Sequence, residues 1–215
     1  MENDARNAPA LKEWDVVVRA LLAGEQILDV RKGGLHERDR HFGLRSTRCW
    51  LYPTFEHQRA DLIKPAYRRW VDEGTDSGEV CIAGWVDIVG VARLADPDHV
   101  TALGSKLVWT DDYLATRLRW KRRDPLWVLV MRAHRLDQPR TIPVRAEYGG
   151  CSSWLDLADL PGDPSVLPAE PAVSDDSFAA RLDLVARELP SGLESVEPTS
   201  AADAPWGGPA GPAMT

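Results

Sequence analysis

A carboxylate and an imidazole stand side by side at Glu56 and His57, directly after the strand-like residues 49–52. Such a pair can act as general base and general acid, or it can read the edge of a nucleobase through hydrogen bonds. In the catalytic version Arg31 would steady an anionic substrate or transition state. The alternative is that His57 fixes a turn by hydrogen bonding. A small hydrolase that uses Glu56 and His57 is therefore one hypothesis for this chain.

Positive charge and an aromatic ring are concentrated in residues 117–123, which hold five cations and one tryptophan. Arginine accounts for 21 of the 26 basic residues of the chain, and its planar guanidinium suits bidentate contacts with phosphate. Such a stretch can bind a nucleic-acid backbone and stack a base. The alternative is the solvated basic end of a helix. A second basic and aromatic group, which favours binding, consists of Arg45, Arg48, Trp50 and Tyr52.

Two glycines follow two cations where β-type sequence ends, at residues 31–34. Adjacent glycines permit positive φ angles and a concave array of backbone N–H groups, which suits an anion. We therefore expect phosphates to be held here and by the 117–123 stretch. The expected phosphate and backbone contacts are Arg31, Lys32, Gly33, Gly34, Arg117, Arg119, Trp120 and Arg122.

Other kinds of chemistry find no support in the motifs. The chain has neither a P-loop nor a Gly-x-Gly-x-x-Gly fingerprint, which disfavours nucleotide hydrolysis and dinucleotide redox chemistry, and we expect no cofactor. The three cysteines and the polar residues 36–41 lack an established ligand spacing, so we expect no metal. We expect no membrane partner, because no run approaches the roughly 18 apolar residues of a spanning helix. The first residues lack the pattern of an export signal, which predicts a cytoplasmic location.

The formal net charge of −7 is unevenly distributed along the chain. Residues 156–215 carry 11 acidic and 2 basic residues, whereas the preceding part carries 22 acidic and 24 basic ones. We expect an N-terminal extension at 1–10, a folded domain at 11–158, and an acidic, proline-rich tail at 159–215 with a disordered end. Within the tail, helical spacing of apolar residues predicts one amphipathic helix at about 175–189. That helix either docks on the domain or binds a protein partner.

The folded domain is predicted to mix strands with fewer helices. Helices are expected at 11–22, around 66–71 and at 111–119, the last with Thr110 as its cap and an acidic first and basic last turn. Apolar and β-branched runs predict strands at 26–30, 49–52, 80–94, 126–131 and 142–148. Because the helices fall between strands without regular βαβ alternation, the expected class is α+β with a curled, mostly antiparallel sheet.

Several motifs resemble the bacterial domain-of-unknown-function family 1802 over about residues 10–158. That family has no established activity. Some of its relatives are linked with restriction-type nuclease domains, which implies a nucleic-acid context by association. The motifs that carry the resemblance are residues 11–14, 24–28, 31–35, 51–58 and 148–154.

A more distant resemblance is to the PUA-like group, small β-barrels such as the ASCH and EVE domains that bind RNA or modified bases. ASCH domains carry a Gly-x-Lys-x-x-Glu-x-Arg pattern, and at its four positions this chain has Gly24, Gln26, Asp29 and Arg31. The resemblance implies a PUA-like barrel with flanking helices. Because glutamine replaces the lysine, lysine-dependent hydrolysis is in doubt, whereas a binding role is compatible with the change.

The leading hypothesis is a cytoplasmic bacterial nucleic-acid-binding module. A base would enter a concave site near Trp50, Tyr52, Glu56 and His57 while the cations hold phosphates. The small hydrolase and a scaffold that binds a protein partner through its 175–189 helix are the alternatives. The acidic tail could also lie over the basic domain and compete with nucleic acid. The leading hypothesis requires that the arginines and rings gather around one hollow.

Overall fold

The computed structural model describes residues 8–31, 44–71, 78–94, 96–119, 126–150, 152–189 and 192–196. The strands are β1 (Ala8–Trp14), β2 (Leu28–Arg31), β3 (Arg48–Thr54), β4 (Glu79–Leu94), β5 (Leu126–Pro143), β6 (Trp154–Leu157), β7 (Ala169–Pro171) and β8 (Glu194–Ser195). The α-helices are α1 (Asp15–Leu22), α2 (Pro97–Gly104), α3 (Asp111–Arg119) and α4 (Asp175–Glu188). Short 3-10 helices are η1 (Ala60–Leu62), η2 (Pro65–Trp70), η3 (Ala146–Tyr148) and η4 (Pro164–Val166).

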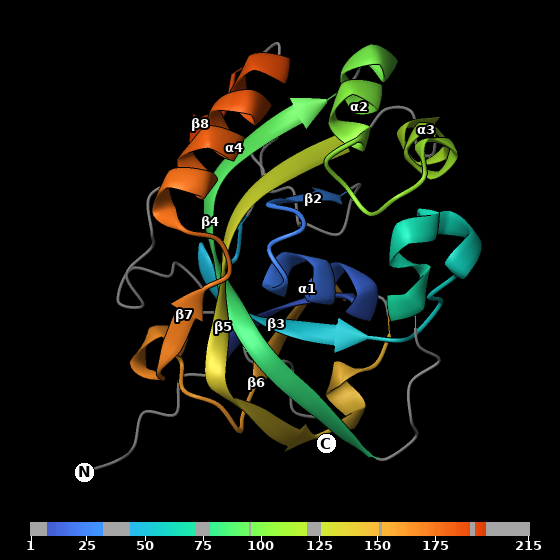
Figure 1. Ribbon diagram of the computed structural model, residues 1–215. Coiled ribbons are helices and arrows are strands. Elements are labelled where there is room, and N and C mark those ends of the chain that lie inside the picture. The colour runs from blue at the N-terminus through green and yellow to red at the C-terminus, as the bar shows by residue number, and fades with distance from the viewer. Residues whose placement is uncertain are drawn as a thin grey trace, which may run out of the picture.

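The strands form one sheet in the order β2-β5-β4-β3-β1-β6, with β7 paired to β5 and β8 paired to β4 (Figure 1). The pairing of β1 with β3 is parallel, and the other pairings among the described strands are antiparallel. The predicted α+β class with a curled, mostly antiparallel sheet is confirmed. The sheet is open in the described chain, because its end strands β2 and β6 are not paired with each other.

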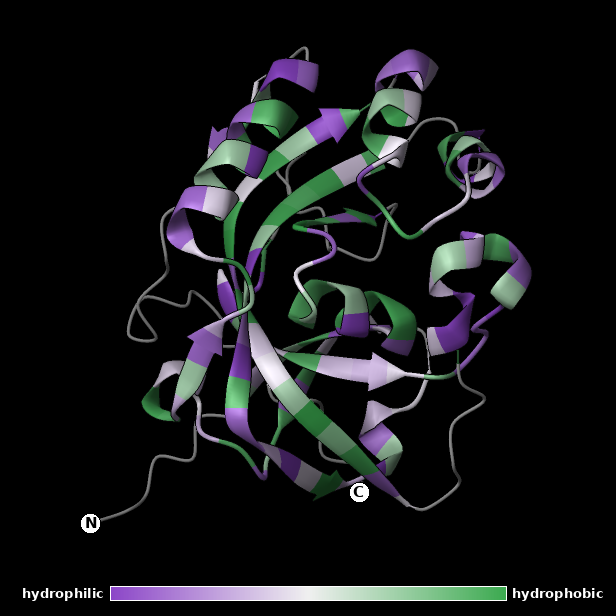
Figure 2. Cartoon of the chain, viewed as in Figure 1, coloured by the Kyte–Doolittle hydropathy of each residue, from purple (hydrophilic) through white to green (hydrophobic). Residues whose placement is uncertain are grey.

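The two longest strands, β4 and β5, pair with each other along almost their whole length. The sheet bends where this pairing is irregular. Their pairing is interrupted by register shifts between Ile82 and Gly84 and between Ile88 and Gly90, and such bulges bend a strand pair. Gly84 is required where it stands, because a Cβ there would lie 2.3 Å from the backbone oxygen of His134. Figure 2 shows that the first half of β5 is hydrophobic and its distal half largely hydrophilic. The sheet is therefore buried at one end and more exposed at the other.

Alternation along the strands divides the apolar side chains between two cores on opposite faces of the sheet. In β3, Cys49 and Leu51 belong to the larger core, whereas Trp50 and Tyr52 belong to the smaller one. The larger core also receives α1, and the smaller core is closed by Tyr148 of η3. The face on which a side chain of β1 or β3 lies therefore decides which of two environments it meets.

Two expectations for the secondary structure are wrong, and both errors come from long-range pairing. The expected helix at 11–22 begins only at Asp15, because the residues before it form β1 between β3 and β6. The expected strand at 142–148 is instead the end of β5 at Pro143 followed by η3. Local periodicity does not report a pairing partner that lies far away in the sequence.

The helix predicted at about 175–189 in the acidic tail is present as α4. Ser174 caps it by accepting a hydrogen bond from the Ser177 N–H. Its apolar face packs into the larger core through Phe178, Val185 and Leu189. The helix is therefore docked on the sheet in this structure, and the face that a protein partner would need is occupied. None of the described helices has the length and hydrophobicity that crossing a membrane requires.

Candidate functional site

A buried cluster of two carboxylates and one guanidinium lies where the carboxyl ends of β1 and β2 meet. We call Glu13, Asp29 and Arg31 the acid–arginine cluster. The Arg31 Nε–H donates to Asp29 Oδ2 at 2.8 Å, and its Nη2 donates to the Lys12 carbonyl oxygen at 3.0 Å and also to Glu13 Oε2. Only 14% of the Glu13 side chain, 8% of Arg31 and 1% of Asp29 is exposed. Charges buried to this degree require partners, and here each partner is a neighbouring charge.

The cluster holds one more negative group than positive groups, and Glu13 shows the consequence. Burial and the negative charge of Asp29 together raise the pKa of Glu13 from 4.5 to about 7, against the opposing effect of Arg31. A carboxyl group that titrates near neutral pH can act as hydrogen-bond acceptor or donor under physiological conditions. A strongly perturbed acid that retains some exposure marks a candidate functional site.

Three aromatic rings lie against this cluster. The centroids of Trp14 and Trp109 are 5.0 Å apart and those of Trp109 and Tyr113 are 4.4 Å apart, so we call these residues the aromatic cluster. The backbone N–H of Trp14 donates to Glu13 Oε1 at 2.9 Å, so the two clusters are adjacent in the chain. The Arg117 guanidinium lies 5.9 Å from the centroid of the Tyr113 ring. Trp14 and Tyr113 are partly exposed, whereas Trp109 is buried.

The charge of the acid–arginine cluster reaches the aromatic cluster. Burial raises the pKa of the Tyr113 hydroxyl, the positive charge of Arg117 opposes this, and the negative charges of Glu13 and Asp29 add to it. The carboxylates, the ring and Arg117 therefore form one electrostatic unit. We call the two clusters together with Arg117 the β1–β2–α3 site, after the elements that supply them.

Backbone hydrogen bonds hold α3 in its place beside the short helices η1 and η2 (Figure 1). Thr110 N donates to the Leu62 carbonyl at 3.0 Å, Lys64 N donates to the Val108 carbonyl at 2.9 Å, and Ile63 forms an isolated bridge with Trp109. The predicted cap of α3 is also present, since the Tyr113 N–H donates to Thr110 Oγ1 at 3.3 Å. Trp109 and Tyr113 are thus fixed by the structure that precedes and begins α3.

Gln26, which stands where the ASCH-like pattern has lysine, contributes to the same support. It is buried, and its Nε2 donates to the Leu28 carbonyl at 2.9 Å. Its Oε1 accepts a hydrogen bond from the Val108 N–H at 3.0 Å. Gln26 therefore connects β2 to the segment that leads into α3. Its role in this structure is to position the site.

The expected base site near Trp50 and Tyr52 is not assembled around Arg31. Trp50 is fully buried and its Nε1–H donates to the Pro161 carbonyl at 3.0 Å, so its ring faces are not accessible to a base. Tyr52 is also buried, its ring lies 5.6 Å from that of Tyr148, and burial raises its pKa to about 12. Both side chains belong to the smaller core, on the face of the sheet opposite the acid–arginine cluster.

Glu56 and His57 also lie apart from Arg31. Lys12 precedes Glu13 in β1, so its side chain points to the other face of the sheet, and its Nζ lies 3.5 Å from Glu56 Oε2. The same Nζ donates to the carbonyls of Tyr148 and Gly150 at 2.9 and 3.0 Å. His57 is exposed and has a positive φ of 61°, a backbone geometry typical of a tight turn. The single hollow that the leading hypothesis required is therefore replaced by two separate groups of residues.

The other expected contacts divide into described and undescribed residues. Arg117 and Arg119 lie on α3, where Arg119 is exposed at the end of the helix. The expected contacts outside the described residues are Lys32, Gly33, Gly34, Trp120 and Arg122. Among the residues that the structure does describe, no three histidine, cysteine, aspartate or glutamate side chains are grouped to hold a metal ion.

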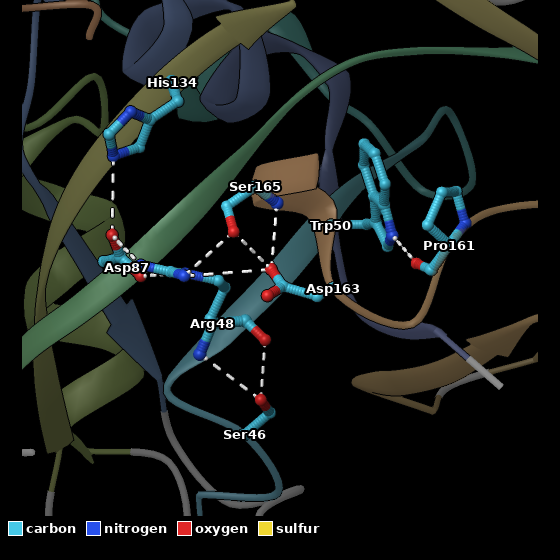
Figure 3. A network of polar contacts seen from close by, with 8 residues as sticks. All are labelled: Ser46, Arg48, Trp50, Asp87, His134, Pro161, Asp163 and Ser165. Atoms are coloured by element: carbon cyan, nitrogen blue, oxygen red, sulfur yellow. Dashed lines mark hydrogen bonds and ion pairs between the residues drawn. The ribbon is translucent and has the colours of Figure 1, made fainter. Parts of the chain in front are cut away.

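In the second basic and aromatic group, Arg48 is paired with Asp87 of β4 and with Asp163 of the acidic tail (Figure 3). Arg48 donates from Nε to Asp87 Oδ1 at 2.7 Å and from Nη2 to Asp87 Oδ2 at 3.2 Å, and its Nη1 lies 3.8 Å from Asp163. His134 Nε2 lies 3.5 Å from Asp87 Oδ2. Although burial opposes the effect, His134 and Arg48 hold the pKa of Asp87 below its ordinary value.

The remaining contacts of this network connect β6 and the segment after it to the rest of the domain. Arg45 pairs with Asp156, and Arg145 pairs with Asp159 at 2.8 Å. Arg48 Nη1 also donates to Ser165 Oγ at 3.1 Å. The basic groups on this side are therefore paired with acids from the chain itself. On α3, the predicted cation Arg117 borders the aromatic cluster through Tyr113.

The fold and the site define an α+β domain whose open sheet positions a buried acid–arginine cluster beside aromatic rings. The chain belongs to the family described as "Domain of unknown function (DUF1802)", whose model matches residues 10–183. This confirms the family expected from the sequence motifs. No curated protein matches the chain.

The chain is similar to solved structures of an ASCH protein from Zymomonas mobilis. The structure of that ASCH protein is 15% identical, with a TM-score of 0.42, and covers 71% of this chain and 88% of its own. Two mutant forms of the same protein are each 14% identical, with TM-scores of 0.41 and 0.40, and cover 71% of this chain and 89% and 91% of their own.

Proposed function

We propose that this protein is a nucleic-acid-binding module that holds a base and the adjoining phosphates at the β1–β2–α3 site. The observation that carries the proposal is the combination found there. Accessible aromatic surface, the Glu13 carboxyl group with its raised pKa, and Arg117 of α3 adjoin one another in a single site. Proteins that bind single strands combine rings for stacking with polar groups for the base edge and cations for the backbone.

The base is assigned to the aromatic cluster. Trp14 and Tyr113 retain exposed surface, and Trp109 packs beneath them in a fixed position. A base stacked on aromatic side chains gains about 1–3 kcal/mol. Glu13 lies beside the rings, bonded to the Trp14 backbone, where its carboxyl group can meet the edge of the stacked base.

The phosphates are assigned to arginines of α3 and to the residues that follow the site in the chain. Arg117 and Arg119 lie on the last turn of α3, and Arg119 is exposed. Trp120 and Arg122 follow α3 directly in the sequence, and Lys32, Gly33 and Gly34 follow Arg31 in the same way. We therefore keep these residues in the proposal as backbone contacts. Arg31 itself is reassigned from phosphate contact to positioning of the two carboxylates.

A fluorescence-anisotropy titration of the full chain tests the proposal. Single-stranded DNA, single-stranded RNA and duplex DNA of one sequence are titrated at low and moderate salt. We expect the single strands to bind more tightly than the duplex, with affinity that falls as salt rises. Arg119→Ala should reduce the slope of log affinity against log salt by about one. Arg140→Ala, at an exposed position on the distal half of β5, is the matched control and should leave the slope unchanged. Absent or salt-insensitive binding would contradict the proposal.

A further inference from the structure

We infer that Glu13 determines base specificity by accepting a hydrogen bond from an exocyclic amino group, so that the module prefers cytosine and adenine to bases with a carbonyl at that position. This inference rests on the proposed nucleic-acid function and assigns its specificity to one residue. Carboxylate side chains are known to read the amino group of cytosine in other recognition settings.

The Glu13 carboxyl group can accept hydrogen bonds beyond those it already makes. Its Oε1 accepts from the Trp14 N–H at 2.9 Å, and its Oε2 accepts from Arg31. Each carboxylate oxygen can accept two hydrogen bonds, so acceptor capacity remains on both. Because 14% of the side chain is exposed against 1% for Asp29, Glu13 is the carboxylate of the cluster that a ligand can reach.

The acid–arginine cluster has two carboxylates and one guanidinium. Two carboxylates share the single guanidinium of Arg31, so the ionised cluster itself carries one net negative charge. A ligand N–H donor relieves this excess, whereas a ligand carbonyl oxygen increases it. The ionised cluster therefore favours an amino group over a carbonyl group at the position that faces Glu13.

The preference for amino-bearing bases should also depend on pH, because it rests on a titratable group. The charged groups that act on Glu13 are Asp29 and Arg31 from β2, and Tyr113 of α3, which Arg117 also affects, lies within reach of its charge. Burial raises the pKa of Glu13 to about 7. Below this pH the protonated carboxyl has lost part of its acceptor capacity, and above it the carboxylate accepts from an amino group. Preference for amino-bearing bases should therefore increase as the pH rises through about 7.

Labelled deoxycytidine and deoxyuridine hexamers test the inference, because the two bases differ in an amino or a carbonyl group at C4. At about pH 8 we expect the wild-type chain to bind the cytidine hexamer about tenfold more tightly. At about pH 6 that ratio should approach one or reverse. Glu13→Gln should give a ratio near one at both pH values, because an amide can donate as well as accept. Glu170→Gln, at an exposed position on β7, is the matched control and should behave as wild type.

The outcomes separate this inference from the proposed function. Binding with a cytidine preference that Glu13→Gln leaves intact, or with no preference at about pH 8, overturns the role of Glu13 alone. No binding to either hexamer overturns the inference and the proposed function together. If Glu13→Gln does not fold, the pH dependence of the wild-type ratio decides, and a ratio that is constant between about pH 6 and pH 8 overturns the inference.

Discussion

Replacing Glu13 with glutamine is expected to change how the stability of the protein depends on pH. The pKa of Glu13 is 4.5 for the ordinary group and about 7 in the folded protein, because the side chain is buried beside Asp29. The folded state therefore binds this proton more tightly than the unfolded state does. The stability that the protonated group provides is complete below about pH 4.5 and is lost as the pH rises to about 7.

The size of this loss follows from the difference between the two pKa values. One pKa unit corresponds to about 1.4 kcal/mol, so the free energy of unfolding should fall by about 3 kcal/mol across this range through Glu13 alone. Glutamine cannot ionise, and it leaves Arg31 paired with Asp29 at 2.8 Å. The Glu13→Gln variant should therefore lack this component of the pH dependence.

Urea unfolding of both proteins at about pH 5, 6, 7 and 8 measures the effect. The stability of Glu13→Gln relative to wild type should rise by about 3 kcal/mol from the lowest pH to the highest. Other carboxylates titrate in both proteins, so the difference at each pH isolates residue 13. Glu170→Gln should show a difference that does not change with pH. A constant difference for Glu13→Gln would refute the account of the acid–arginine cluster.

Three further substitutions test other parts of the structure. Lys12→Met removes the donors to the carbonyls of Tyr148 and Gly150 and should cost about 1–3 kcal/mol in the free energy of urea unfolding; an unchanged value would contradict the role given to this buried amine. Ser174→Ala removes the cap of α4 and should cost about 1 kcal/mol by the same measurement, with no loss expected if the cap is unimportant. Tyr113→Leu should weaken single-strand binding by about 1–3 kcal/mol in an anisotropy titration; unchanged affinity would remove Tyr113 from the proposed site.

Local sequence signals were sufficient for the elements whose ends are set by neighbouring residues. Thr110 caps α3 as expected and Ser174 caps α4, since their hydroxyls accept hydrogen bonds from N–H groups three residues later. The long apolar and β-branched runs became β4 and the first half of β5. In each case the physical cause lies within a few residues of the effect.

The candidate site could not be predicted in the same way, because it depends on contacts between distant parts of the chain. Glu13 and Arg31 meet only after β1 pairs with β3 and β2 pairs with β5. Trp109 and Tyr113 join them through the docking of α3. The sequence around Glu13, which stands between Lys12 and Trp14, did not mark it as a buried carboxylate or identify its partner.

Trp50 was expected in the site because the sequence did not show on which face of the sheet its side chain lies. A shift of one residue moves a side chain to the opposite face of a sheet, and sequence alone did not show which face of β3 bore the site. Cys49 faces the larger core and Trp50 the smaller. Trp50 and Tyr52 are therefore core residues, and the rings of the aromatic cluster come from other elements.

The indole N–H resonances of the tryptophans provide the most direct test of the proposed binding site. Isotope-labelled full chain is titrated with a single-stranded oligonucleotide, and the indole signals are assigned by single substitutions. The account predicts that the signals of Trp14 and Trp109 move as the strand binds, while those of Trp50 and Trp85 on the opposite face stay in place. Movement of Trp50 and Trp85 alone, or of none of the four signals, would contradict it.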